Sequence, residues 1–439
     1  MPFPTIDDLI GRLKELGATQ VISKPLSEND NSKQQIYLGK SMQALSVLPY
    51  GEVTTSAAGK TQTFKAALRL RWIDADGHVA DALGAQLILY PKYPEVRLSG
   101  FLRGCPIAPA EQLRPVPGGQ RRFNNGPDGR VLFLATTADG TVLAYLATAG
   151  SAVAREFVRL MRGGTLQALG VFWQLPVLSA HAGRVALLAR LRLIHHAGWH
   201  RSRRMRSDGS VCAYTARNGG GYTLEALFNI RPNAHAAPDF MGWELKAIAR
   251  SRVTLMTPEP DTGFYAVRGA GDFVRKFGRP VNRTTFYFTG AHRVGRRCSG
   301  TGLELRLRGF DVQGGKITQV DGGIELFDPA QPGAVLAGWS YSRLIGHWGS
   351  KHASAAYVSY ASRVAGVLYE YRYLSPVQLG EQTDFSLFLT SLAEGSVVFD
   401  PGSKVTSVDG VSRVKARSQF RVPRTCLSSL YRTFGSVTL

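Results

Sequence analysis

The chain has 439 residues, of which 44% are hydrophobic and 19% are charged, as is typical of globular proteins. It contains 53 Lys and Arg against 32 Asp and Glu, so its net charge is +21 and its pI is about 10.1. This composition excludes a disordered chain, and the absence of any run of about 18 apolar residues predicts no membrane span. The positive charge predicts a polyanionic partner, because Lys and Arg release condensed counterions when they bind nucleic-acid phosphates.

The first 17 residues, MPFPTIDDLIGRLKELG, predict an acidic amphipathic helix. They lack the basic start and apolar core of a signal peptide. The four cysteines lie far apart and form no CxxC pair, which argues against a disulfide framework or a zinc site. The cysteine pattern therefore predicts a reducing, cytoplasmic location.

Short β-rich runs follow this helix, separated by turn-forming sequences such as DADG, NNGPDG and ADG. These runs are QQIYLG, AALRLRWI, AQLILYPKY, EVRLSGFL, RVLFLATT and TVLAYLAT. A helix at about Ala152–Met161 and the apolar strand ALGVFWQLPVL come next. Many short strands with few helices predict a mostly β domain, a barrel or a sandwich, over residues 1–178.

The rest of the chain, residues 179–439, begins with the amphipathic helix ALLARLRLIHHAGWH and then mixes both element types. GYTLEALFNI predicts a helix that starts from an RNGGG loop, where the glycines allow either a hinge or a close backbone approach. Strands are expected at WELKAI, RVTLMT, TTFYFTG, LELRLRGF and GGIELF, and helices at DFVRKFG and SYSRLIGHW. This order predicts a mixed α/β domain with a central sheet.

The stretch PDFMGWELK places three charged residues beside large apolar ones. Residues two apart on a strand share a face, about 6.6 Å apart, so Glu244 and Lys246 project together. Asp239 lies five residues before Glu244, and a straight strand would place it on the opposite face. A bend at the permissive Gly242 would bring all three charges onto one patch.

Two carboxylates and one ammonium on one patch suit metal-assisted hydrolysis of a phosphodiester. Asp239 and Glu244 would supply hard oxygen ligands to Mg²⁺, which activates water and offsets charge in the transition state. Lys246 would orient the attacking water or stabilise the developing charge. A solvated strand edge explains the spacing as well, but Glu225 on the preceding helix adds another acid. Acid, acid and lysine in this order form the PD-(D/E)xK nuclease arrangement.

At these residues the sequence resembles the MvaI/BcnI family of restriction endonucleases, whose core is similar to those of the MutH mismatch-repair nickase and Sau3AI. The resemblance covers roughly residues 180–435, through GWH, NGGGYTLEALFNI, APDFMGWELKA and RVTLMTPEP, and more thinly EQTDFSLFL and RSQFRV. It implies a restriction-endonuclease-like fold with Asp239 and Glu244 as metal ligands, Lys246 as the catalytic lysine and Glu225 as a supporting acid.

The same resemblance implies an activity. Such an enzyme is a type II restriction endonuclease of the bacterial cytoplasm that depends on Mg²⁺. It acts as a monomer on double-stranded DNA, nicks each strand of a short, nearly palindromic site in turn, and leaves a 5′-phosphate.

The region expected to recognise bases departs from the family pattern. Where family members carry a histidine-rich segment before a final FRI strand, this chain has SRVKARS before Phe420-Arg421-Val422. Basic side chains here suit guanine edges or phosphates, and phosphate contacts are the commoner kind. The candidates are Arg413, Lys415, Arg417 and Arg421. The loop GHWGSKHASAAY predicts a further DNA-facing set, which is His347, Lys351 and His352.

The N-terminal part resembles the effector domain of EcoRII, a DNA-binding pseudobarrel of the plant B-three type. SKPLSENDNSKQQIYLG and PKYPEVRLSGFLRG would be its two DNA-contacting arms, although hairpin loops with solvated charges explain these segments equally well. The first arm would use Lys24, Asn29, Asp30, Lys33 and Gln34, and the second would use Lys92, Arg97 and Arg103. A second module would tether the catalytic unit between two nicks.

The sequence therefore predicts a two-domain, Mg²⁺-dependent endonuclease whose partner is double-stranded DNA, with no obligate protein partner. Two alternatives stay open. One is a repair-type nickase that cuts a single strand, and the other is a DNA-binding regulator in which PDFMGWELK is only structural.

Overall fold

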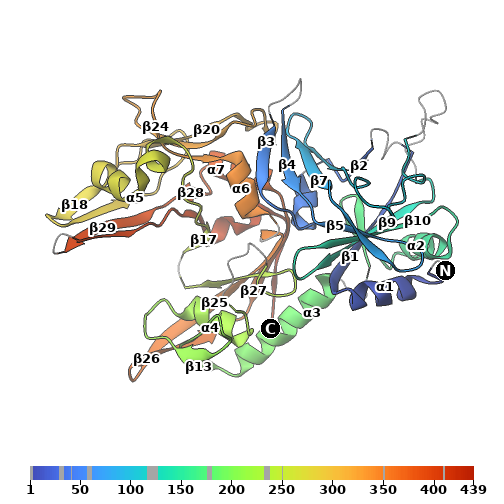
Figure 1. Ribbon diagram of the computed structural model, residues 1–439. Helices are drawn as coiled ribbons and strands as arrows, with labels where there is room; N and C mark the ends of the chain where they lie inside the picture. Colours follow the sequence, from blue (N-terminus) through green and yellow to red (C-terminus); the bar gives the residue numbers. More distant parts are fainter. Residues whose placement is uncertain are drawn as a thin grey trace. The chain divides into compact units, whose positions relative to one another are not determined.

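The computed structural model describes residues 3–28, 34–40, 42–56, 62–115, 127–175, 180–231, 238–249, 251–349, 352–408 and 411–439. Contacts divide the chain into two compact units, one mainly up to Arg190 and the other mainly from Leu191 onward (Figure 1). The division falls within helix α3 (Ala180–His196). The domain boundary predicted after residue 178 stays a prediction.

Among the described residues, the first unit contains α-helices, a short 3-10 helix and many strands. Its elements are α1 (Ile6–Glu15), β1 (Ala18–Pro25), β2 (Gln35–Tyr37), η1 (Met42–Ser46), β3 (Val53–Ser56), β4 (Thr63–Ala67), β5 (Leu70–Ile73), β6 (Val79–Ala82), β7 (Gln86–Tyr90), β8 (Glu95–Ser99), β9 (Val131–Thr137), β10 (Val142–Ala147), α2 (Ala152–Arg162), β11 (Gln167–Leu169), β12 (Phe172–Gln174) and the start of α3.

Two sheets form this unit, with strand orders β11-β12-β1-β9-β10-β5-β6 and β2-β8-β7-β4-β3. The strand-rich character predicted from the sequence is confirmed. The described strands do not close into a barrel, because both sheets end in open edges. Helix α1 begins at the N-cap Thr5, whose side chain accepts a hydrogen bond from the Asp8 backbone. Its buried Ile6 and Leu9 share a core with Phe157 of α2.

In its described residues, the second unit alternates strands with helices and ends with a 3-10 turn before the last strand. Its elements are β13 (Trp199–Arg201), β14 (Arg203–Met205), β15 (Val211–Ala213), α4 (Gly220–Leu227), β16 (Glu244–Ile248), β17 (Arg252–Met256), α5 (Gly263–Phe277), β18 (Arg279–Asn282), β19 (Thr285–Thr289), β20 (Glu304–Arg308), β21 (Phe310–Asp311), β22 (Lys316–Ile317), β23 (Gly323–Phe327), β24 (Val335–Ser340), α6 (Tyr341–Trp348), β25 (Ser354–Ala365), β26 (Leu368–Tyr373), β27 (Val377–Thr383), α7 (Phe385–Ala393), β28 (Val398–Phe399), β29 (Gly402–Val408), β30 (Val411–Lys415), β31 (Phe420–Pro423), η5 (Arg424–Leu430) and β32 (Tyr431–Val437).

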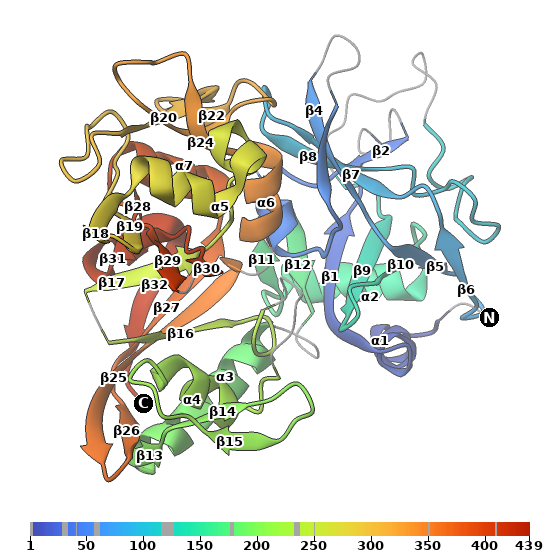
Figure 2. The ribbon, with the colours of Figure 1, turned by 60° about the vertical axis from the view of Figure 1, so that its left-hand side comes forward.

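The central sheet of this unit has strand order β13-β26-β25-β27-β32, and β16 pairs with β25 off this path (Figure 2). The β16–β25 pairing is parallel, whereas the neighbours of β25 on its other ladders are antiparallel. The mixed α/β architecture with a central sheet, predicted from the order of elements, is present in this part of the chain. Among the described residues, no helix is both long and apolar enough to cross a membrane.

The glycines before α4 are required by close packing. A Cβ on Gly220 would lie 2.4 Å from the Tyr360 ring, whereas one on Gly221 would meet nothing within 4 Å. The Tyr373 hydroxyl also donates a hydrogen bond to the Gly220 carbonyl at 2.7 Å. The close backbone approach that the glycines allow therefore occurs at Gly220. It lets α4 pack against Tyr360 of β25 and Tyr373 of β26.

Replacing Gly220 with Ala should lower the free energy of unfolding by about 1–3 kcal/mol, because the added methyl group overlaps the half-buried Tyr360 ring. Gly221→Ala is the matched control, since it adds the same methyl group in open space within a helix. It should leave stability unchanged or raise it by about 0.5–1 kcal/mol. Urea unfolding followed by circular dichroism measures both. Equal effects of the two substitutions would contradict the packing role of Gly220.

Candidate active site

The bend expected before Glu244 occurs at Met241 and Gly242, where φ is 44° and 86°. Glycine adopts such positive φ values without steric cost, which other residues rarely do. After the bend, Oδ2 of Asp239 accepts a hydrogen bond of 2.9 Å from the backbone N–H of Leu245. Asp239 is thereby fixed against the residue that separates the other two charged side chains.

Glu244 and Lys246 form a close ion pair on β16. The Lys246 Nζ lies 2.5 Å from Oε1 of Glu244. The Lys246 side chain is 19% exposed and the Glu244 side chain is 3% exposed. Leu245 and Trp243 are buried. Because Glu244 is almost completely shielded from water, it is not part of a solvated strand edge. The Lys246 ammonium offsets part of the desolvation cost of this carboxylate.

Two tyrosine hydroxyls lie near Glu244. Tyr357 of β25 is the pairing partner of Lys246 in the parallel ladder, and its hydroxyl lies 2.8 Å from that of Tyr431 on β32. Burial raises the pKa of both tyrosines, and the negative charge of Glu244 raises the pKa of each further. Both hydroxyls are therefore protonated near neutral pH. The local spacing gave no signal for these residues, which are distant in sequence from β16.

Glu225 lies on α4, which packs against β16. Its side chain is half-buried. Burial raises the pKa of Tyr373 in β26, and the charge of Glu225 makes a smaller contribution in the same direction. Glu225 does not form a three-ligand group with Asp239 and Glu244 in the described structure. Its role as a supporting acid stays a prediction.

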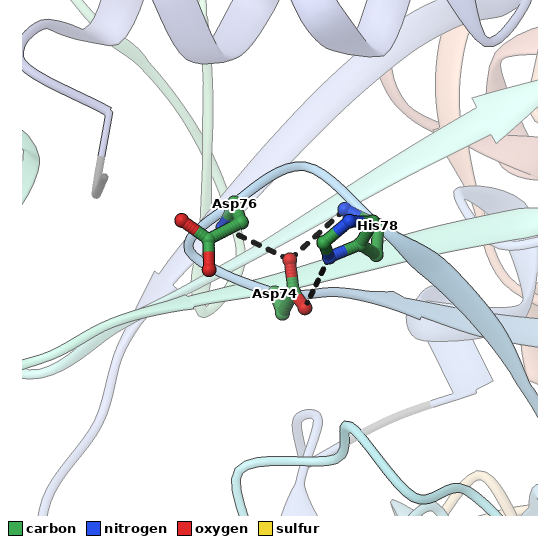
Figure 3. A group of neighbouring side chains, drawn as sticks. All are labelled: Asp74, Asp76 and His78. Atoms are coloured by element: carbon green, nitrogen blue, oxygen red, sulfur yellow. Dashed lines mark hydrogen bonds and ion pairs between the residues drawn. The ribbon is translucent and has the colours of Figure 1, made fainter.

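The described residues contain one group of three potential metal ligands in close proximity, namely Asp74, Asp76 and His78 (Figure 3). The Asp74 carboxylate accepts hydrogen bonds of 2.9 Å from the backbone N–H groups of Asp76 and His78. Burial alone would raise the pKa of Asp74, but hydrogen bonds from His78 and Asp76 outweigh it and lower the pKa. These contacts are those of a tight turn joining β5 and β6, at the DADG sequence where a turn was expected.

The basic residues predicted near the C-terminus occupy two different environments. Arg413 and Lys415 are exposed on β30, and Arg417 is exposed just after it. Arg421 of β31 instead pairs with Asp400, with Nη1 2.8 Å from Oδ2, and Arg252 pairs with the same oxygen at 3.1 Å. Arg421 thus takes part in a structural ion-pair network that joins β17, β31 and the loop after β28.

The second predicted DNA-facing loop is only partly described. His347 lies on α6 and is half-buried. His352 is 1% exposed and stacks on Trp348, with ring centroids 4.5 Å apart. A histidine in this position packs in the interior rather than presenting its ring to solvent. Lys351 lies outside the described residues.

The residues predicted to form two DNA-contacting arms also differ in exposure. Lys24 is 4% exposed within β1, which is not the surface position expected of an arm. Gln34, Lys92 and Arg103 are exposed. Arg97 is half-buried and pairs with Glu95 at 2.8 Å. The predicted Asn29, Asp30 and Lys33 lie outside the described residues.

Comparison with known proteins gives a matching family and several similar solved structures, including the two described here. The model of the MvaI/BcnI restriction endonuclease family matches residues 188–431. Restriction endonuclease MvaI in complex with cognate DNA substrate is 17% identical over 57% of this chain and 97% of that chain, with a TM-score of 0.44. MvaI in the absence of DNA is 16% identical over 58% and 98%, with a TM-score of 0.33. None of the curated proteins matches the sequence.

The family match covers more than half of the residues and includes every element of the charged site. The membership implied by PDFMGWELK and its neighbours is therefore confirmed, together with the enzyme class. The chain belongs to the MvaI/BcnI restriction endonuclease family and is a type II site-specific deoxyribonuclease.

Proposed function

We propose that this endonuclease cleaves both strands of duplex DNA at a short, nearly palindromic site, using Mg²⁺ held by Asp239 and Glu244. One observation carries the proposal. The bend at Gly242 fixes Asp239 against Leu245, so its carboxylate is anchored beside the strand that bears the Glu244–Lys246 pair. An acidic pair and an ammonium held on one short segment fit the PD-(D/E)xK arrangement.

The donor atoms suit a small divalent cation. Mg²⁺ prefers carboxylate oxygens and water. Oδ2 of Asp239 is engaged by the Leu245 N–H, while Oδ1 accepts no hydrogen bond within the described part of the chain. When bound, Mg²⁺ would lower the pKa of a coordinated water and offset negative charge on the phosphate. Anchoring through one oxygen leaves the other oriented for coordination.

Lys246 supports the reaction through its remaining N–H donors. An ammonium has three donors, and one of them is directed to Glu244 at 2.5 Å. The other two can orient the attacking water and contact a phosphate oxygen. The side chain is only 19% exposed, so this charge acts in a poorly solvated environment where electrostatic interactions are stronger.

The remaining parts of the proposal concern the mode of action. The enzyme acts as a monomer in the bacterial cytoplasm, nicks the two strands in turn and leaves a 5′-phosphate. Residues 1–178 form a DNA-binding module similar to the EcoRII effector domain, and residues 179–439 form the endonuclease domain. A tethered second module keeps the catalytic unit at a high effective concentration between two nicks.

Asp239→Asn should reduce DNA cleavage at least about 100-fold while preserving the fold. The amide oxygen can still accept the hydrogen bond from Leu245, but it lacks the charge that a metal ligand needs. Lys246→Met, which keeps the aliphatic stem, should have an effect of similar size. A plasmid-cleavage gel with Mg²⁺ or EDTA measures both variants.

Asp208→Asn, in the exposed turn between β14 and β15, is the matched control and should cut like the parent protein. Full activity of Asp239→Asn, or cleavage by the parent in EDTA, would refute the site. Nicked circles that never become linear would show a single-strand nickase, and tight binding without scission would show a regulator.

Arg413→Gln and Arg421→Gln should separate DNA contact from structural support. Arg413 is exposed, so its removal should weaken DNA binding without changing stability. Arg421 is 23% exposed and paired with Asp400, so its removal should lower the free energy of unfolding by about 1–2 kcal/mol. Fluorescence anisotropy with duplex DNA and urea unfolding measure the two effects. The interpretation fails if Arg421→Gln changes base preference at unchanged stability.

A further inference from the structure

A row of like charges crosses one face of the sheet β18-β19-β29-β30. The ladder pairs Arg279 with Tyr287, Tyr287 with Lys404, and Lys404 with Lys415. Directly paired side chains lie about 4.5–5.5 Å apart on the same face, and like charges in such pairs are destabilising. The Lys404 ammonium also lies 5.3 Å from the centre of the Tyr287 ring. Three cations are thus aligned over roughly 14 Å, which is three strand spacings.

The opposite face of this sheet is covered by α5 (Figure 2). Phe273 of α5 contacts Phe288 of β19, with ring centroids 4.9 Å apart. Val414 of β30 approaches the same helix, because a Cβ on Gly271 would lie 3.2 Å from its Cγ2. Because α5 packs on the apolar face of the sheet, Arg279, Lys404 and Lys415 lie on the face that α5 does not cover.

This basic face continues into a pocket of about 450 Å³, a volume within the range of about 300–1,000 Å³ usual for ligand sites. Four arginines line it, and Arg279 belongs to both the pocket and the row. The main lining residues are Arg279, Thr289, Arg293, Arg296, Arg297 and Cys298. None of the four arginines forms an ion pair in the described part of the chain, although the protein contains many Arg–carboxylate pairs elsewhere.

The loop that carries these arginines is held rigidly. His292, which is fully buried, lies 2.8 Å from the Thr301 hydroxyl through Nε2, and its backbone N–H donates to the Phe399 carbonyl at 2.8 Å. Arg297 Nε donates to the Gly302 carbonyl at 2.9 Å. A Cβ on Gly290 would lie 2.9 Å from the Cys298 sulfur. The backbone of this loop and the Arg297 side chain are therefore held in place before any ligand arrives, which reduces the entropy lost on binding.

We propose that this arginine pocket binds a backbone phosphate of DNA and that the row Arg279, Lys404 and Lys415 guides the same strand toward it. The proposal rests on the proposed function, since it assigns a DNA-anchoring surface to the same nuclease. Guanidinium groups bind phosphate oxygens through paired N–H donors, and several unpaired arginines around one cavity suit a dianionic or polyanionic ligand. The adjoining row of cations favours a continuous DNA strand over a free phosphate, because an isolated ion would not extend across four β-strands.

Phosphate contacts position a protein on DNA without reading sequence. Occupation of the pocket should therefore strengthen binding to every duplex by a similar factor. It should also contribute to the dependence of affinity on salt, by about 0.9 in the slope of log K against log salt for each phosphate neutralised.

The test compares two double variants. The pocket variant carries Arg293→Gln and Arg296→Gln, and the control variant carries Arg268→Gln and Arg275→Gln. Both are made in an Asp239→Asn background, so that binding is measured without cleavage. The control pair removes the same charge from α5, on the covered side of the sheet. Anisotropy of a labelled random-sequence duplex is measured across a range of salt concentrations. The pocket variant should lose about tenfold in affinity, and its salt slope should fall by about 1–2. The control should change affinity by about twofold or less.

A second arm uses inorganic phosphate as a competitor. Phosphate should displace DNA from the background protein more effectively than from the pocket variant. Thermal unfolding checks that the variants are folded, and the single substitution Arg297→Gln repeats the test at a different side chain.

Equal losses in the pocket and control variants would overturn the pocket assignment while leaving the nuclease proposal intact. Binding of inorganic phosphate at the pocket with unchanged DNA affinity would also overturn it, because the site would then serve a free anion. Absence of any duplex binding by the background protein would instead refute the proposed function itself.

Discussion

The backbone reversal at Met241 and Gly242 is the constraint on which the charged site depends. A side chain on Gly242 would meet open space, so packing does not require glycine there. The requirement is conformational, because φ is 86° at this position. In a straight strand Asp239 would point away from Glu244. With the reversal, its carboxylate accepts the Leu245 N–H and becomes part of the start of β16. The backbone conformation at one residue thus determines where the Asp239 carboxylate lies relative to β16.

Burial determines the electrostatic environment of the Glu244–Lys246 ion pair. Glu244 is 3% exposed, and a carboxylate in that environment needs a nearby cation or hydrogen bonds. Lys246 supplies the cation from the same strand, while the sheet brings Tyr357 and Tyr431 close from β25 and β32. The parallel pairing of β16 with β25 therefore does more than complete the sheet. It also places Tyr357, a neutral residue whose pKa is raised by burial, next to Lys246 in the ladder.

Local patterns predicted those features that depend on neighbours in sequence. Alternation in WELKAI predicted the shared face of Glu244 and Lys246, and the single glycine predicted the bend. Long-range pairing was not predictable, since strand register is set by distant partners and tertiary packing. Tyr357 was missed for that reason, and so was the ion pair between Arg421 and Asp400. Lys24 likewise lies in a run of four consecutive buried residues of β1, and this burial was not evident from the local sequence.

The distribution of charge also follows from pairing rather than from composition. A net charge of +21 predicted a polyanionic partner but could not locate its surface. The folded chain separates its arginines into two groups. Arg306 and Arg308 share Glu325 at 2.8 Å each, and such pairs hold strands together. The arginines between β19 and β20 have no carboxylate partner in the described structure, and Lys404 directly faces Lys415. Repulsion of this kind lowers stability unless a partner neutralises it. The arginines without a carboxylate partner therefore mark the surface where a negatively charged ligand is expected. The arginines paired with Glu325 stabilise the fold instead.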